Sequence, residues 1–390
     1  MMKIQQDIEN LYEEMVHMRR HMHMHPELSF KEAETKQYIY EQISDLGLDI
    51  RQNVGGNGIV ARLDIDDDFK TIALRADFDA LPIEDEKDVP YRSTVPGIMH
   101  ACGHDAHTAM LITTARILAA RKEELKVNVV FLFQHAEEML PGGAQAMIED
   151  GALDGVDYIF GTHVSSLYPT GTLSYTKDFA YAAADAFTIT VEGRGGHGAE
   201  PHEAVDPVVA GASLIQQLQS IVSRTVDPLK SAVVTTSMFN GGSSFNVIPN
   251  SVELRGTIRT FEQSVKDDVL RRMDGIIKGI ESSFEVTCKL DYQHGYPALL
   301  NNNSQLDHVL HSLEDAAYVK ITEENPPSMG GEDFAYYLEK VPGCYFYTGV
   351  RNPEKGIDHP HHHPLFDIDE DGLKAGVESL CSIVLNFNDH

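Results

Sequence analysis

Hydrophobic residues recur at three- and four-residue steps near the start of the chain and along several later segments. This spacing places apolar side chains on one face of a helix. It predicts helices over about the first 20 residues, over 31–46 with Gly47 after the last turn, and over 104–124. Between these segments, short β-branched runs predict strands over 58–65, 71–76, 127–133 and 157–164. Strands that alternate with amphipathic helices indicate an α/β sheet with helices on both faces.

The order of elements changes after about residue 183. Hydrophobic patterning there predicts strands and helices in the order βαββαβ, over 186–192, 204–222, 232–239, 252–260, 263–282 and 284–291. This order is that of the split βαβ, ferredoxin-like unit. Helix and strand signals then resume over 305–317, 331–338, 345–349 and 370–387. We therefore predict a discontinuous α/β domain over 1–182 and 294–390, interrupted by an inserted ferredoxin-like domain over 183–293.

Charge and composition narrow the classes of partner. The 390-residue chain carries 60 acidic and 31 basic residues, a formal net charge of −29. Such a surface disfavours nucleic acid or an anionic membrane as the main partner. No run approaches the roughly 18 apolar residues of a membrane span, and the first residues show no apolar signal segment. Four cysteines without paired spacing fit a reducing compartment, so we expect a cytoplasmic protein.

Histidine is the compositional outlier, with 19 copies, of which eight lie within 17–25 and 359–363. The most informative cluster is HACGHDAH (100–107), which lies between a Pro- and Gly-containing segment and a predicted helix. Cys102 and His104 are two residues apart, so an extended loop lets both side chains reach one ion. A thiolate with an imidazole suits a borderline-soft divalent metal such as zinc. Taken alone, the pair fits a buried cysteine beside surface histidines better than a metal site.

Further candidate ligands follow predicted strands. Glu137 and Glu138 come just after the apolar run VNVVFLF, His163 closes another strand, and Asp77 and Asp79 end a third. Open α/β sheets place their sites at the carboxyl ends of strands. Consecutive side chains in extended backbone point in opposite directions, so one glutamate can bind a metal while the other faces the substrate as a base. The two aspartates suit carboxylates that orient ligating imidazoles.

A histidine-rich loop, HPHHHPLF (359–366), completes the candidate set. Four of the five residues in 359–363 are histidine, and about 24 residues of ordinary amphipathic sequence follow, which argues against a cloning tag. Some of these histidines are expected to be solvated bystanders. Several strand ends and loops that all offer Cys, His, Asp or Glu together predict a metal site.

Motifs along most of the chain resemble the M20 metallopeptidases, in particular the aminoacylase/hippuricase-like amidohydrolase branch. The resemblance extends from HPELSF (25–30) to FDIDE (366–370) and includes, in order, RADFDALP, HACGHDAH, QHAEE, GGHGAEPH, NVIPN, GTIRTF, MGGEDF and H-x-P-x-F. It implies a mixed-sheet catalytic domain with helices on both faces. The inserted domain would be a lid and dimerisation domain, through which the chain forms a homodimer or a higher homo-oligomer.

The resemblance also implies two divalent metal ions per chain, with zinc, manganese and cobalt as candidates. The two-metal site maps onto Cys102, His104, Glu138, His163 and His362. His362 is chosen because it occupies the histidine of H-x-P-x-F. His361 and His363 are the alternatives if the motif alignment shifts by one residue.

Other positions acquire catalytic roles from the same resemblance. Glu137 matches the general base, and Asp79 matches the acidic residue that supports the site, with Asp77 as the weaker candidate. In the inserted domain, His197 of GGHG matches a histidine that reaches the substrate carbonyl. Asn246 of NVIPN and Arg259 of GTIRT match substrate-binding positions of that domain.

The chain departs from the family pattern at three positions, Gly198, His135 and His363, and none of them removes a ligand or the base. The sequence therefore predicts a metal-dependent amidohydrolase that converts N-acyl amino acids to a carboxylic acid and a free amino acid. A dipeptidase or small-peptide exopeptidase is the main alternative, and N-acetyl-diaminopimelate deacetylation is a narrower version.

Two further alternatives belong to other classes. A thiol hydrolase would use Cys102 as the nucleophile, with His104 or His107 as its base. A metal-storage protein would explain the histidine clusters, but it leaves Glu137 and the inserted domain without a role. Chelation separates the first of these from a metal-dependent enzyme, because a thiol hydrolase should survive the removal of metal.

Overall fold

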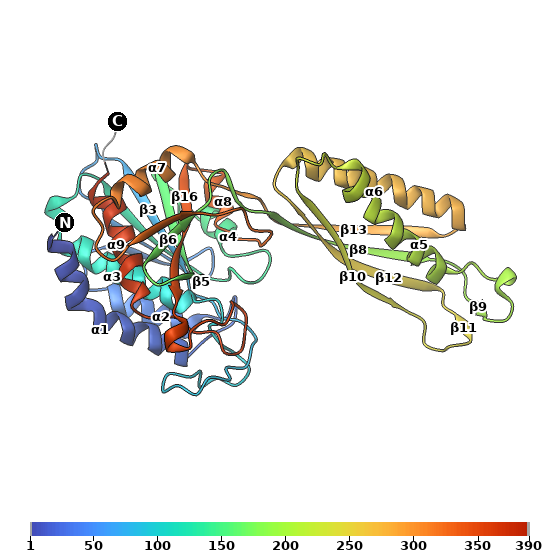
Figure 1. Cartoon of the computed structure of the whole chain (residues 1–390), viewed down its shortest axis with the longest axis horizontal. Coiled ribbons are helices and arrows are strands. Elements are labelled where there is room, and N and C mark those ends of the chain that lie inside the picture. The colour runs from blue at the N-terminus through green and yellow to red at the C-terminus, as the bar shows by residue number, and fades with distance from the viewer. Residues whose placement is uncertain (1, 388–390) are drawn as a thin grey trace. The chain divides into compact units, whose positions relative to one another are not determined.

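The computed structural model describes residues 2–387, which form two compact units (Figure 1). The first unit comprises Met1–Ala180, Leu300–Pro327 and Asp333–His390, and the second comprises Tyr181–Leu299 and Ser328–Glu332. Residues 1 and 388–390, which fall in the expected discontinuous domain, lie outside the described residues. Hydrophobic patterning predicted that 328–332 belongs to the discontinuous first domain, whereas the structure groups this segment with the second unit.

An eight-stranded mixed sheet forms the centre of the first unit. In spatial order its strands are β1 (Asp49–Val54), β2 (Gly58–Leu63), β4 (Asn128–Gln134), β3 (Thr71–Asp77), β5 (Tyr158–Pro169), β16 (Gly343–Arg351), β6 (Thr172–Tyr175) and β15 (Ile321–Glu324). The four central strands β4, β3, β5 and β16 are parallel, whereas β2 and β6 run antiparallel to their central neighbours. The central strands therefore present their carboxyl ends at one edge of the sheet.

Helices cover both faces of this sheet. Phe160 of β5 lies 6.1 Å from the ring of His308, whereas a Cβ at the next residue, Gly161, would lie 3.0 Å from the ring of Phe334 on the other face. Helices α3 and α9 pack together, α1 packs on both, and α4 packs on α8. The helices of this unit are α1 (Met2–Met24), α2 (Ala33–Ile43), α3 (His104–Ala120), η1 (Lys122–Glu124), α4 (Ala144–Glu149), α7 (Asn303–Ser312), α8 (Ala335–Leu338), η4 (Pro353–Lys355) and α9 (Gly372–Leu385).

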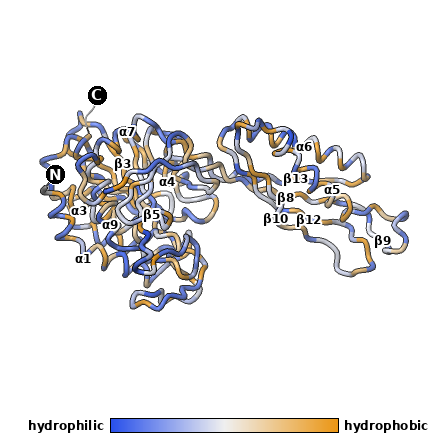
Figure 2. Tube along the Cα trace, in the orientation of Figure 1, coloured by the Kyte–Doolittle hydropathy of each residue, from blue (hydrophilic) through white to orange (hydrophobic). Residues whose placement is uncertain are grey.

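Burial explains which strands the hydrophobic pattern reveals. Every residue of β3 and β4 is buried, because the helices cover both faces and neighbouring strands cover both edges. The edge strand β1 instead alternates exposed and half-buried residues, and β15 at the other edge is exposed throughout. Hydrophobic patterning consequently predicted neither edge strand. Along the surface helices α1 and α6 (Gln263–Phe284), hydrophobic and hydrophilic residues alternate in the same way as buried and exposed positions do (Figure 2).

The second unit is built on a four-stranded antiparallel sheet. Its spatial order is β10 (Ala232–Gly241), β12 (Ser251–Thr260), β8 (Ala183–Glu192) and β13 (Thr287–Tyr296). Helices α5 (Pro207–Ser220) and α6 pack on this sheet and enclose a separate hydrophobic core with Phe187, Ile189 and Val191 of β8. The chain order is βαββαβ, and the predicted fold class, a mixed-sheet α/β protein with an inserted ferredoxin-like unit, is confirmed.

Short elements complete the second unit and its junction. Strands β9 (Gly196–His197) and β11 (Val247–Ile248) form a two-stranded ribbon, and β7 (Phe179–Tyr181) pairs with β14 (Leu299–Leu300). Helix α5 begins at Pro207, three residues later than patterning predicts, because the Asp206 side chain accepts a hydrogen bond from Val208 N at 2.8 Å and caps the helix there. Elements η2 (Pro201–Glu203) and η3 (Ile221–Thr225) flank this helix. None of the helices within residues 2–387 is long and apolar enough to cross a membrane.

Candidate functional site

The carboxyl ends of the central strands bring candidate residues from distant parts of the chain together. Strands β4, β3 and β5 are parallel neighbours, and Asp77 at the end of β3 lies opposite Gln134 at the end of β4. The glutamates follow β4, and His163 lies on β5. The structure thus brings seven of the predicted site residues to one edge of the sheet: Asp79, Cys102, His104, Glu137, Glu138, His163 and His362.

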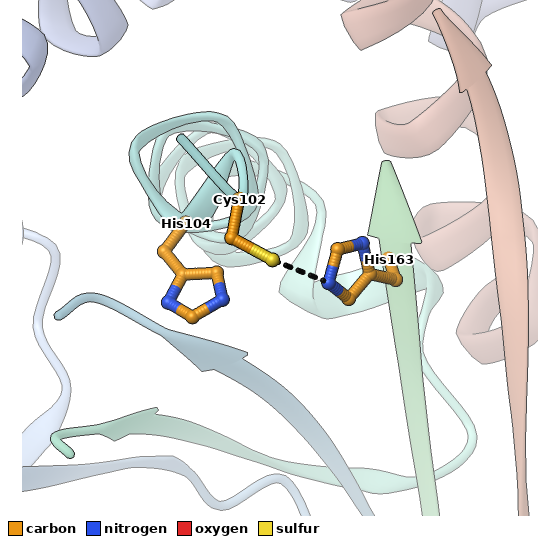
Figure 3. A group of neighbouring side chains, drawn as sticks. All are labelled: Cys102, His104 and His163. Carbon is orange, nitrogen blue, oxygen red and sulfur yellow. Dashed lines mark hydrogen bonds between the residues drawn. The ribbon is translucent and has the colours of Figure 1, made fainter. Parts of the chain in front are cut away.

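Cys102, His104 and His163 form the first group of donors. Figure 3 shows Cys102 and His104 at the start of α3 and His163 on β5, with the side chains directed toward one another. Cys102 Sγ lies 3.4 Å from His163 Nε2, and one donor atom from each residue lies within 4.8 Å of the others. Gly103 makes this turn possible, because its φ is +93° and a Cβ there would lie 2.3 Å from Val164.

A carboxylate fixes the orientation of His104. Its Nδ1 donates to Asp79 Oδ1 at 3.2 Å, and the other oxygen of Asp79 accepts from Ser29 Oγ at 2.7 Å and from Glu138 N at 3.0 Å. This leaves His104 Nε2 buried without a hydrogen-bond partner among the described residues, 3.8 Å from Glu138 Oε1. A carboxylate on one nitrogen commonly prepares the other nitrogen to bind a metal.

Electrostatics favour a cation at the same place. Burial alone would lower the pKa of His104, but Asp77 and Asp79 outweigh it and raise the pKa to about 10. Burial and the carboxylates Glu138 and Glu137 raise the pKa of the Cys102 thiol well above its usual range. An activated cysteine nucleophile needs an electropositive environment. This acidic environment therefore suits a thiolate that binds a metal and disfavours the thiol-hydrolase alternative.

The second group of donors consists of Cys102, Glu138 and His362, again with donor atoms within 4.8 Å of one another. Glu138 Oε1 lies 3.4 Å from His362 Nε2 and accepts no hydrogen bond among the described residues, although it is buried. The two groups share Cys102, so its sulfur is placed to contact two ions.

The three consecutive histidines of the 359–366 loop have different surroundings. His361 Nε2 accepts from Ser166 N at 3.3 Å, and His363 Nδ1 accepts from Leu365 N at 3.0 Å. Among residues 2–387, the groups of close metal donors include His362 and neither of its neighbours. The backbone of His362 is in the left-handed region, with φ +64°.

Glu137 and the other strand-end carboxylate, Asp77, have different surroundings. Glu137 is only 7% exposed and lies in a group with Glu138 and His104. Asp77 instead accepts from Arg75 Nη1 at 2.6 Å and from His107 Nδ1 at 2.5 Å. Arg75 was not singled out in the sequence, although it stands two residues before Asp77 in RADFDALP.

His107 is near the site but its ring nitrogens are already used. Its Nδ1 donates to Asp77, and its Nε2 accepts from Val164 N at 2.9 Å. Although Asp77, His104 and His107 lie close enough to form a donor group, these bonds leave His107 no nitrogen for a metal. Its role is to hold Asp77 and the end of β5 in place.

The donor set fits two divalent ions. Five ligands exceed the four of a single tetrahedral site. A thiolate, imidazoles and a carboxylate suit zinc and other divalent transition metals. Two of the donor atoms, His104 Nε2 and Glu138 Oε1, are buried and without a hydrogen bond among the described residues. Buried polar atoms seldom stay unpartnered in native proteins, so a bound cation accounts for both.

The remaining predicted residues, His197, Asn246 and Arg259, belong to the second unit. His197 is exposed on β9, where its Nδ1 accepts from Ala199 N at 3.0 Å. Asn246 precedes β11, and its carbonyl accepts from Gly198 N at 2.9 Å, so His197 and Asn246 are neighbours.

Arg259 lies at the opposite end of the same unit. It pairs with Ala184 near the start of β8, whereas the β9–β11 ribbon adjoins Asn250, which precedes β12. Eight residues of β12 separate Ser251 from Arg259, roughly 26 Å at about 3.3 Å per residue. Burial lowers the pKa of Arg259, which makes no ion pair among residues 2–387.

Fold and site together define a metal-dependent hydrolase that acts on amide bonds. The chain belongs to peptidase family M20/M25/M40, whose model matches residues 73–386. YhaA of Bacillus subtilis (strain 168) is 44% identical over 386 residues, covering 99% of this chain and 98% of YhaA. An N-acyl-L-amino acid amidohydrolase of Geobacillus stearothermophilus is 40% identical over 299 residues, covering 77% of this chain and 81% of that protein.

Solved structures agree with this assignment. The YXEP protein of Bacillus subtilis, described as a dinuclear metal binding peptidase from the M20 family, matches with a TM-score of 0.84 and 33% identity. The match covers 97% of this chain and 98% of that chain.

Proposed function

We propose that this chain is an amidohydrolase that uses two divalent metal ions to cleave N-acyl amino acids to a carboxylic acid and a free amino acid. The observation that carries the proposal is the position of Glu137, a nearly buried carboxylate within 4.8 Å of the metal donors Glu138 and His104. A metal-storage protein has no use for such a base. The similarity to an N-acyl-L-amino acid amidohydrolase supports the substrate class.

In this reaction the side chains have separate tasks. Five residues hold the ions: Cys102, His104, Glu138, His163 and His362. When bound, the two ions, whether zinc, manganese or cobalt, polarise the amide carbonyl and make water more acidic. Glu137 accepts a proton from the attacking water and delivers it to the leaving amine. Asp79 keeps His104 Nε2 directed toward Glu138.

Residues of the second unit supply substrate recognition. Arg259 binds the substrate carboxylate, because its planar guanidinium offers two parallel hydrogen bonds. His197, with Asn246 beside it, stabilises the negative charge that develops on the carbonyl oxygen. The length of β12 prevents a single copy of this unit from placing Arg259 and His197 on the same amino-acid-sized substrate.

We therefore infer a homodimer that forms through the second unit, which serves as the lid and dimerisation domain. In this dimer, Arg259 and His197 that act on one substrate come from different copies. Apolar side chains near the β9–β11 ribbon support an interface there, since Phe245 is fully exposed and Val247 is 51% exposed. Strand β10 supports the same inference, because it lies at the sheet edge with Met238 45% exposed. The four cysteines are free, which supports a cytoplasmic location.

A substrate screen on metal-reconstituted protein tests the proposal. N-acetyl and N-benzoyl amino acids should be hydrolysed, whereas dipeptides with a free α-amino group should not. Preference for free dipeptides would favour the peptidase alternative. Glu137→Gln is the control for contaminating hydrolases, because it should abolish the measured activity.

A further inference from the structure

A buried cluster of charged side chains lies behind the metal donors, centred on Arg19 of α1. The side chain of Arg19 is fully buried. Its Nε lies 2.9 Å from Asp105 Oδ2, its Nη2 lies 3.0 Å from Asp367 Oδ1, and its Nη1 lies 3.3 Å from Glu370 Oε1. One guanidinium thus contacts three carboxylates that come from two distant segments of the chain.

Two of these carboxylates adjoin the metal-binding segments. Asp105 directly follows His104 in the first turn of α3, and Asp367 ends the loop that carries His362. The two segments also touch directly. His362 N donates to the carbonyl of Ala101 at 2.8 Å, and a Cβ at Gly103 would lie 3.6 Å from the ring of Phe366. Arg19 is therefore a link between the segment that holds Cys102 and His104 and the segment that holds His362.

Arginine is suited to this link. Its planar guanidinium donates from Nη2 to Asp367 and places Nε beside Asp105 at the same time, a spread of nitrogens that a lysine ammonium cannot reproduce. His23 Nδ1 also lies 2.7 Å from Asp105 Oδ2, and Tyr91 OH donates to Asp367 Oδ2 at 2.8 Å, but Arg19 contacts both carboxylates. Without Arg19 the two segments would lose the cation that they share.

The two halves of the metal site depend on this link to different extents. His104 is held by Asp79, and His163 is held by the carbonyl of Val164 at 2.6 Å, so neither needs Arg19. The His362 side chain is 51% exposed, and its ring has only the ion-pair contact to Glu138 among the described residues. A shift of the 362–367 segment would therefore affect the His362 position first.

We propose that Arg19 is a positioning residue that sets the distance between the His104 and His362 segments and so determines the affinity of the ion that His362 binds. The inference rests on the proposed two-metal function. Arg19 touches neither substrate nor metal donors, and it acts through Asp105 and Asp367.

Arg19→Lys tests the proposal, with Arg20→Gln as a matched control. Arg20 is the next residue of α1 and also bonds Glu370, through Nε at 2.8 Å and Nη2 at 2.6 Å, but its contacts do not include Asp105 or Asp367. Zinc binding is titrated on the full-length protein by competition with a chromogenic chelator. We expect Arg19→Lys to bind one zinc as tightly as the parent and the second about 10–100-fold more weakly, the usual cost of disturbing groups that orient ligands.

Kinetics supply the second readout. At limiting zinc, Arg19→Lys should have a reduced kcat, and excess zinc should restore kcat with KM unchanged. A role in stability alone would weaken both ions alike, because metal binding is linked to folding, whereas the proposal predicts weakening of the second ion only. Asp367→Asn should reproduce the loss of the second zinc, and it keeps the test independent of how well any Arg19 variant folds. Arg20→Gln should match the parent in both measurements.

The outcomes separate the proposal from the function on which it rests. Two zinc ions bound with parental affinity in both Arg19→Lys and Asp367→Asn would overturn the positioning role alone. Equal weakening of both ions would also overturn it, because the His362 position would not be selectively affected. A parent protein that is active with fewer than two ions would overturn the two-metal function, and with it the role of Arg19.

Discussion

The two units of this chain hold their candidate site residues in opposite ways. In the first unit the donors are mostly buried, and a neighbouring carboxylate or carbonyl fixes each of the imidazoles of His104 and His163. In the second unit His197 is exposed on a short ribbon, and Arg259 lies at the other end of the sheet. Groups that hold the ligands in place raise the affinity of a metal site, so the first unit gains from fixing its donors. Groups that act only on substrate can be assembled later by a moving unit or by a second copy.

Removal of metal should have the largest effect, because all five predicted metal donors lie in the first unit. Chelation should abolish hydrolysis, and divalent zinc, manganese or cobalt should restore it with about two ions per chain. Elemental analysis measures the number of ions per chain, and an activity assay on the same sample measures hydrolysis. Fully active protein with one ion or fewer would show that the shared donor Cys102 does not serve two ions. Activity that survives chelation would favour the thiol-hydrolase alternative.

Exchange of the neighbouring glutamates divides the first unit further. Glu137→Gln should keep both metals and lower kcat by about 10⁴-fold or more, at or beyond the upper end of the usual range for general acid–base catalysis, because the amide retains the shape but cannot accept a proton. Glu138→Gln should weaken metal binding together with activity. Metal content and turnover on both variants decide the assignment. Loss of metal from Glu137→Gln with retention in Glu138→Gln would reverse the two roles.

Substitution in the second unit should affect the reaction and leave the metals in place. His197→Ala should lower kcat about 10²–10³-fold, the usual effect of removing one donor to a developing oxyanion. Its metal content should equal that of the parent. Mixing His197→Ala with inactive Glu137→Gln protein tests whether the two units act across copies, since recovered activity requires His197 from one chain and Glu137 from another. Lost metal in His197→Ala would contradict the contrast between the units.

Acid should produce the smallest effect, through the half-buried His308 of the first unit. Burial lowers the pKa of His308, whose Nε2 donates to the carbonyl of Ile383 at 2.9 Å. The unfolded chain takes up that proton near pH 6.5, so the stability from neutral His308 is present above about pH 6.5 and is lost as pH falls toward the folded pKa. His308→Gln should therefore make the fall in Tm between pH 7 and pH 5 less steep.

His311 provides the control for this measurement, because it lies on the same helix and its side chain is 74% exposed. His311→Gln should leave the pH dependence of Tm unchanged. An identical fall in Tm for the parent and both variants would show that His308 does not contribute to acid sensitivity.

Much of this architecture could be predicted from the sequence because its signals are local. The run VNVVFLF identifies β4 because a strand covered on both faces needs apolar residues throughout. The order βαββαβ was similarly readable from hydrophobic periodicity. The edge strands β1 and β15 could not be found this way, since exposed residues carry little hydrophobic signal.

The sequence by itself determined which residues offer metal-binding chemistry, because donor atoms and motif spacing are properties of the chain. Only the tertiary structure decided how Asp77 and Asp79 differ. Asp77 accepts hydrogen bonds from Arg75 and His107, whereas Asp79 accepts them from Ser29 and His104.

Tertiary structure alone also revealed Arg19, whose partners lie more than 80 residues away along the chain. It placed the β9–β11 ribbon, with His197, near the start of β12 and placed Arg259 near the end of β12. Local patterns cannot report such arrangements, because long-range pairing depends on which segments meet when the chain folds.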